Sequence, residues 1–137
     1  MTLSWKSSAV LVIALFASAC GASLKTVTFN VLEGGRQVEV SRMFNDGLGA
    51  DTSAANAFKA VQKGDIPEAT KMMQSEVALH PNNQFHHWDL AILYEAASQW
   101  DKAEAEMKEC IRIEPKEKMY ADELAFIENH KAALKHG

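Results

Sequence analysis

The chain has 137 residues, of which 47% are hydrophobic and 23% are charged. This composition is typical of one folded domain and excludes wholesale disorder. The formal net charge is −4 at pH 7, and the lysines and arginines form no cluster. Because phosphate backbones are bound by basic surfaces, the charge argues against nucleic acid as the main partner.

The N-terminal segment has the three parts of a secretory signal. Lys6 precedes nine consecutive apolar residues, 9–17, and Ala17-Ser18-Ala19 follow as a small-residue exit. A membrane-spanning helix needs about 20 apolar residues, so this run is too short to span. A basic start, a short apolar centre and an A-x-A exit predict a signal peptide over residues 1–19 that is cleaved before Cys20.

The residues at this boundary, Ala17-Ser18-Ala19-Cys20, resemble the end of a bacterial lipoprotein signal. The resemblance implies acylation of the Cys20 thiol, a lipidated spacer over residues 20–25, and a membrane anchor. Gly21 resembles the residue of lipoproteins that are sent to the outer membrane, which implies a location on its periplasmic face. Ala17 departs from the leucine that is usual in the family, so a soluble periplasmic or secreted protein is the alternative.

Residues 26–44 alternate between polar and apolar side chains, which predicts a β-hairpin. Gly34-Gly35 suits a two-residue turn, and that turn pairs Glu33 with Arg36. The same register pairs Val31 with Val38, Phe29 with Val40, and Val27 with Arg42. One face is then apolar, and because an isolated hairpin is marginally stable, it is expected to pack on the following helices, a second copy or a partner.

Residues 45–50 are predicted to form a turn-rich linker, and residues 51–137 a helical domain. At an offset of 34 residues this domain matches itself. The matched pairs are Ala57 with Ala91, Ala69 with Ala103, Met73 with Met107, and Pro81 with Pro115. Small residues at such positions let paired helices approach closely, and each proline ends a unit.

This period, with Leu90-Ala91, Tyr94, Ala103, Met107 and Pro115 in the second unit, resembles tetratricopeptide repeats. His87 departs from the usual first aromatic residue, Ala91 from glycine, and Met107 from phenylalanine. The resemblance implies a mainly α fold: two helical-hairpin repeats and a C-terminal cap helix, preceded by the β-hairpin. Because such arrays usually need about three units, the hairpin or self-association as a homo-oligomer is expected to complete this one.

In this family the first helix of each unit lines a concave groove that binds peptides. Carried over by the 34-residue register, the resemblance implies a mostly apolar groove with acidic edges. Its residues would be Phe58, Val61, Gln62, Phe85, Trp88, Ile92, Glu95, Met119, Asp122 and Phe126. Such a groove suits an amphipathic helix or an extended apolar peptide. Alternatively, these side chains pack under the hairpin of the same chain or in a dimer.

No metal site or cofactor is expected. His86 and His87 point about 100° apart on a regular helix and cannot chelate one ion together. Catalytic motifs of phosphate-binding loops, serine hydrolases and zinc proteases are absent from the sequence. Cys110 is expected to be a small buried thiol rather than a nucleophile, and His130 and His136 are expected to be solvated.

We therefore expect a membrane-tethered envelope lipoprotein that is not an enzyme. It would act as a protein–protein interaction adaptor or assembly factor through the groove. A soluble periplasmic or secreted peptide-binding protein of the same fold is the first alternative. An enzyme or metal carrier with an unrecognised site is the second.

Overall fold

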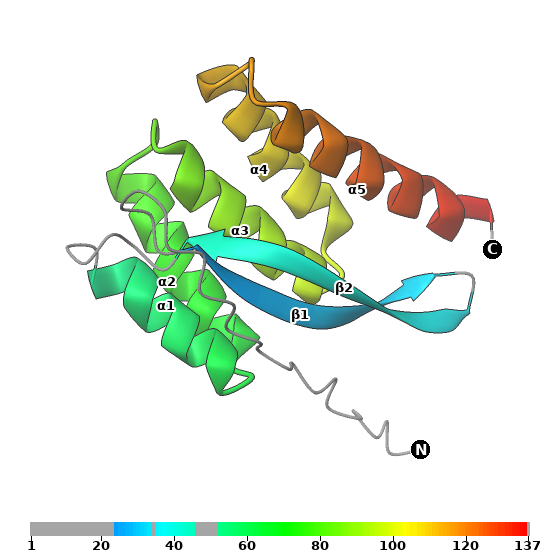
Figure 1. Ribbon diagram of the computed structural model, residues 1–137, viewed down its shortest axis with the longest axis horizontal. Helices are drawn as coiled ribbons and strands as arrows, with labels where there is room; N and C mark the ends of the chain where they lie inside the picture. Colours follow the sequence, from blue (N-terminus) through cyan, green and yellow to red (C-terminus); the bar gives the residue numbers. More distant parts are fainter. Residues whose placement is uncertain (1–23, 34, 46–51, 137) are drawn as a thin grey trace.

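The computed structural model describes residues 24–33, 35–45 and 52–136 (Figure 1). The strands are β1 (Leu24–Glu33) and β2 (Arg36–Asn45). The helices are α1 (Thr52–Gln62), α2 (Ile66–Leu79), α3 (Gln84–Ala96), α4 (Trp100–Ile113) and α5 (Lys118–His136). The described chain is mainly helical and is preceded by an antiparallel hairpin, which confirms the predicted fold class. The expected signal peptide, Cys20 and most of the linker lie outside the described residues.

The strands pair in the predicted register. Glu33 is opposite Arg36, and Val27 is opposite Arg42. Both strands extend slightly beyond the predicted 26–44, because Leu24 still pairs with Asn45. Gly35 adopts a φ of 79°, a conformation that glycine reaches without steric cost. The turn therefore sets the register, and the register places the apolar residues together.

The helices pack in sequence order, with α1 against α2, α2 against α3, α3 against α4, and α4 against α5. Residues that match at the 34-residue offset occupy equivalent places in the two helix pairs. All of those at the helix contacts are fully buried: Ala57, Ala69, Met73, Ala91, Ala103 and Met107. In both helix pairs, therefore, the alanines let the helices approach closely and a methionine fills the space between them.

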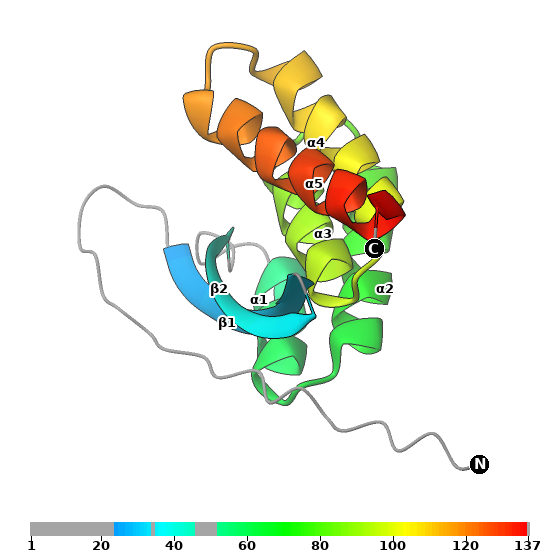
Figure 2. The same cartoon turned by 90° about the vertical axis from the view of Figure 1, so that its right-hand side faces the viewer.

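The hairpin lies along one side of the helices (Figures 1 and 2) and packs on α3. Val27, Phe29 and Val31 on β1 are each at most 2% exposed. Phe44 on β2 is fully buried, and its ring centroid lies 5.9 Å from that of Phe58 on α1. Burial of a large apolar side chain stabilises a fold by about 1.5–3 kcal/mol, so the hairpin belongs to the core.

The turns within the two helix pairs have the same backbone conformation but different residues. Gly64 has a φ of 77°, and Ser98, its equivalent at the 34-residue offset, has a φ of 56°. Their N–H groups donate to Val61 O at 2.9 Å and to Glu95 O at 2.8 Å, respectively. A left-handed conformation after a helix favours glycine, so the second turn carries a strained residue where the first does not.

Ser98→Gly is expected to raise the free energy of unfolding by about 1 kcal/mol, because a left-handed non-glycine residue costs about 1–2 kcal/mol and glycine loses part of that gain as entropy. Urea denaturation measures the change. Gly64→Ser is the matched control and should destabilise by a similar amount, since a Cβ there meets no heavy atom within 4 Å. A destabilising Ser98→Gly would contradict the strain argument.

Candidate functional site

Half of the expected groove residues are buried in the core that the helices and hairpin share. Phe58, Val61, Trp88, Ile92 and Glu95 are all at most 4% exposed. The expectation that these five line an open groove is therefore corrected. The physical reason is the hairpin, whose apolar face needs cover and finds it on the same side of the helices.

The other five expected groove residues keep at least part of their surface. Gln62 at the end of α1 is exposed, and Phe85 in the first turn of α3 is 44% exposed. On α5, Asp122 is exposed, while Met119 and Phe126 are half-buried. The remaining open part of the expected groove thus includes a row of residues on α5 beside β2.

Trp88 joins three elements. Its Nε1–H donates a hydrogen bond of 2.6 Å to the Met43 carbonyl on β2. Its ring centroid lies 5.6 Å from that of Tyr120 on α5. At 4% exposure, Trp88 contributes to stability and links α3 to both β2 and α5.

A cluster of charged groups lies between the hairpin and the helices. Arg42 Nε donates to Glu123 Oε1 at 2.8 Å, and Arg42 Nε also lies 3.6 Å from Glu95 Oε2. The guanidinium carbon is 4.3 Å from the ring centroid of Phe126. Glu95 is fully buried, and the side chain of Arg42 is 14% exposed. Arg42 on β2 therefore interacts with two carboxyl groups, that of Glu95 on α3 and that of Glu123 on α5.

Burial acts on both carboxyl groups of the cluster. Burial, reinforced by the neighbouring Glu123, raises the pKa of Glu95 to about 9, although Arg42 opposes the rise. Burial also raises the pKa of Glu123, against the opposing effect of the Arg42 guanidinium at 2.8 Å. We assign Glu95 as protonated at neutral pH and Glu123 as the ionised partner of Arg42, because a second buried negative charge would be uncompensated.

Sequence reasoning placed Glu95 in the groove and paired Arg42 with Val27, but it did not connect Glu95 with Arg42. The signal was present, because Arg42 is paired with Val27 and stands two residues after Val40, so it lies on the apolar face of the hairpin. A charge on the buried face of a strand requires an opposite charge on whatever covers that face.

The side chains of His87 and Cys110 both have hydrogen-bond partners within the protein. His87 Nδ1 lies 2.7 Å from Glu106 Oε2, and its Nε2 lies 2.9 Å from Pro81 O. The hydrogen bond to Glu106 raises the pKa of His87. Cys110 is free and fully buried, and burial raises the pKa of its thiol to about 12. The predicted burial of the Cys110 thiol is confirmed.

His130 differs from its prediction. It is 6% exposed, and its ring stacks on Trp100 with centroids 4.9 Å apart and lies against Phe126. The expectation of a solvated His130 was wrong, because α5 turns this residue toward α4 rather than toward solvent. Glu104 binds Lys108 and Lys131, and these ammonium groups lower its pKa to about 2.

Within residues 24–33, 35–45 and 52–136, no group of three or more histidine, cysteine, aspartate or glutamate side chains is arranged to hold a metal ion. No helix in this part of the chain has the length and apolar character needed to cross a membrane. In comparisons with known proteins, no family model and no curated protein matches the chain.

The stability of the protein is expected to fall between about pH 4.5 and pH 9 because of Glu95. In that window the unfolded chain ionises this carboxyl while the folded chain keeps it protonated. The folded state therefore binds the extra proton, and rising pH disfavours it by about 1.4 kcal/mol for each pH unit. Glu95→Gln cannot titrate, so its free energy of unfolding should decline less between pH 5 and pH 8.5.

Urea denaturation at several pH values checks this, with Glu104→Gln as the control. The pKa of Glu104 is lowered rather than raised, so its stabilising effect is present above about pH 4.5 and is lost as pH falls toward 2. Glu104→Gln should lower the free energy of unfolding by a constant amount above about pH 4.5 and should change the slope of the profile only below that pH. Parallel profiles for Glu95→Gln and the unsubstituted protein above pH 5 would show that Glu95 is ionised in the fold.

Proposed function

We propose that this chain is an outer-membrane lipoprotein, anchored through Cys20 on the periplasmic side, that acts as a protein–protein interaction adaptor. It binds an extended segment of its partner along the free edge of β2, next to α5. The observation that carries the proposal is the exposure of this strand edge beside the surviving groove residues of α5. The proposal assigns no catalytic role, cofactor or metal to the chain.

The tether places the hairpin near the membrane. The N-terminal signal supports acylation at Cys20, and only residues 21–23 separate Cys20 from the start of β1 at Leu24. Four extended residue steps span at most about 14 Å. The beginning of β1 would therefore stay close to the lipid, and the turn at the other end of the ten-residue strand would point away from it.

The pairing register identifies which backbone groups face the free edge of β2. Because the residues that flank a two-residue turn form a hydrogen-bonded pair, alternate residues of β2 direct their N–H and C=O groups away from β1. These are Gln37, Glu39, Ser41 and Met43. The hydrogen bond from Trp88 to the Met43 carbonyl agrees with this assignment.

Side chains cover only one end of this edge. Trp88 donates to Met43 O, and Arg42 Nη1 donates to Ser41 O at 3.1 Å. Within the described chain, no backbone–backbone hydrogen bond joins β2 to anything but β1. The groups of Gln37 and Glu39 therefore remain available to another strand, as in recognition by strand addition.

The edge of β2 is better suited to this role than the edge of β1. On one rung of the hairpin, Thr28 of β1 is 3% exposed whereas Ser41 of β2 is exposed. On the next rung, Asn30 is half-buried whereas Glu39 is exposed. A partner therefore reaches β2 more easily than β1.

The surroundings of β2 define the chemistry of the partner segment. Arg42 contacts both Glu123 and Phe126, so β2 lies next to α5, and Figure 1 shows β2 on the α5 side of β1. Phe126 and Met119 keep part of their apolar surface, while Glu39 and Asp122 are exposed carboxylates. We propose an extended partner segment that alternates apolar with polar or basic residues.

The tether is tested by the mass of the mature protein. Cleavage before Cys20 with added acyl mass is expected, and Cys20→Ser should remove that mass and release the protein from the membrane fraction. The released variant also shows whether the lipid matters for localisation alone. A mature chain that begins at Cys20 without acyl mass would leave the soluble periplasmic or secreted adaptor as the function.

Strand addition is tested with two proline variants on one rung of the hairpin. Glu39→Pro removes an N–H that faces the free edge of β2, and Asn30→Pro removes the equivalent N–H on β1. Both positions tolerate proline better than their neighbours, because neither N–H bonds across the hairpin. Peptides selected from a random library on the Cys20→Ser protein should bind Glu39→Pro about fivefold more weakly, since one hydrogen bond of about 1 kcal/mol is lost.

The Asn30→Pro protein should bind the same peptides within about twofold of the unsubstituted protein. Thermal unfolding of both variants shows whether the hairpin remains folded. Equal losses of affinity in the two variants at equal stability, or no loss in either, would rule out the β2 edge as the binding site.

A further inference from the structure

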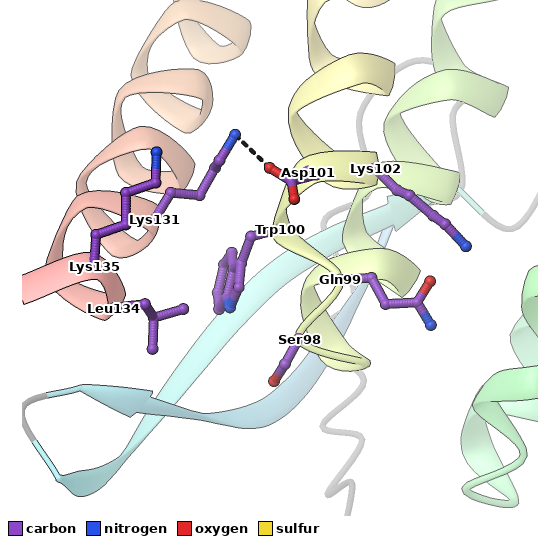
Figure 3. Close-up of a pocket in the computed structure, with 8 residues that line it drawn as sticks. All are labelled: Ser98, Gln99, Trp100, Asp101, Lys102, Lys131, Leu134 and Lys135. Atoms are coloured by element: carbon purple, nitrogen blue, oxygen red, sulfur yellow. Dashed lines mark ion pairs between the residues drawn. The ribbon is translucent and has the colours of Figure 1, made fainter. Parts of the chain in front are cut away.

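A cavity of about 470 Å³ lies at the end of the helical array, between the α3–α4 turn and the last turns of α5 (Figure 3). Its apolar part is formed by Trp100 and Leu134, which face each other in Figure 3. The Trp100 side chain is buried, at 7% exposure, while Leu134 is 55% exposed. Leu134 is not buried in the core, and it lies beside the Trp100 ring. Together these side chains form a recess for one apolar side chain of a partner.

The charge of this cavity is opposite to that of the whole protein. Lys102, Lys131 and Lys135 line it together with one acidic residue, Asp101, although the chain carries a formal charge of −4. Asp101 is 2.7 Å from Lys131, which also binds Glu104. Lys135 forms no ion pair with any residue that the structure describes, so its ammonium group is available to an anion.

Both walls of the cavity are departures from the repeat. Helix α3 has 13 residues whereas α5, which starts at the equivalent position, has 19. The additional residues supply Lys131, Leu134 and Lys135. If α5 had the same length as α3, it would end before Lys131 and would not reach the cavity.

The other wall is the turn that replaces the favourable Gly64-Asp65 of the first unit by Ser98-Gln99. The Asp65 side chain accepts a hydrogen bond from Glu68 N, whereas Gln99 makes no such capping bond to α4. Ser98 has the strained φ of 56°. Residues that violate local structural rules tend to serve another purpose, and both of these line the cavity.

We infer that this cavity is a second protein-binding site, which takes an apolar side chain flanked by an acidic residue in a partner segment. The apolar side chain enters between Trp100 and Leu134. The carboxylate next to it binds Lys135, with Lys131 one helical turn away. Because the cavity lies at the end of the molecule where the hairpin turns (Figure 3), the proposed tether at Cys20, close to the other end of the hairpin, leaves the cavity facing away from the membrane, toward a soluble partner rather than a lipid surface.

The test uses NMR of the Cys20→Ser protein with three capped pentapeptides. Their sequences are Gly-Glu-Leu-Glu-Gly, Gly-Gln-Leu-Gln-Gly and Gly-Lys-Leu-Lys-Gly. The indole N–H signal of Trp100, assigned with Trp100→Phe, should shift saturably with the acidic peptide. It should shift more weakly with the neutral peptide and not with the basic one. The indole signal of Trp88, which is bonded to Met43 O, should stay in place.

Lys135→Glu should raise the dissociation constant of the acidic peptide at least fivefold. Lys71→Glu, an equal charge change on the exposed face of α2, should leave it within twofold. Equal binding of neutral and acidic peptides, unchanged binding in Lys135→Glu, or no saturable shift would overturn the inference. Binding of anionic phospholipid vesicles through Lys135 without binding of any peptide would overturn it in favour of a lipid surface. Glu39→Pro should not affect this site, so the two sites fail or succeed separately.

Discussion

The structure depends on the packing of the N-terminal hairpin against the helices. Two helix pairs and a final helix leave one apolar side without cover, and a two-stranded hairpin has the same problem on its inner face. The hairpin and the helices therefore cover each other's apolar surfaces. The apolar part of this contact consists of Phe44 packed on Phe58 and of the buried β1 residues from Val27 to Val31. Neither the hairpin nor the helices therefore have a complete hydrophobic core alone.

The charged cluster beside this contact adds specificity of placement. Arg42 on the inner face of β2 meets Glu95 and Glu123, which come from different helices. A slip of the hairpin by one residue would turn Arg42 outward and leave Glu123 buried without a cation. Apolar contacts alone tolerate small shifts, whereas a buried ion pair with two carboxyl groups at different distances does not. The cluster therefore sets the position of β2 relative to α3 and α5.

Much of the fold could be predicted because its causes are local. The alternation of residues 26–44 and the Gly34-Gly35 turn predict the hairpin and its register, and the 34-residue period predicts the buried small residues Ala57 and Ala91. The site was harder, because burial of Trp88 and Glu95 depends on what covers them. The sequence left the hairpin, a dimer and a partner open as covers, and no pattern within the helices distinguishes these. The cavity at Trp100 depends on how the end of α5 lies beside the turn between α3 and α4, and periodicity does not reveal that packing.

The pairing of Arg42 with Glu123 joins residues 81 positions apart, and it has a consequence for how the chain matures. The hairpin leaves the ribosome, and any export channel, long before α5. Until the last helix is present, Glu95 and Arg42 lack their full set of partners and the inner face of β2 lacks one of its neighbours. Contacts between such distant segments form late and slowly. A chain that stops before α5 therefore lacks Glu123, the partner of Arg42, and loses the contact that fixes the position of β2 relative to the last helix.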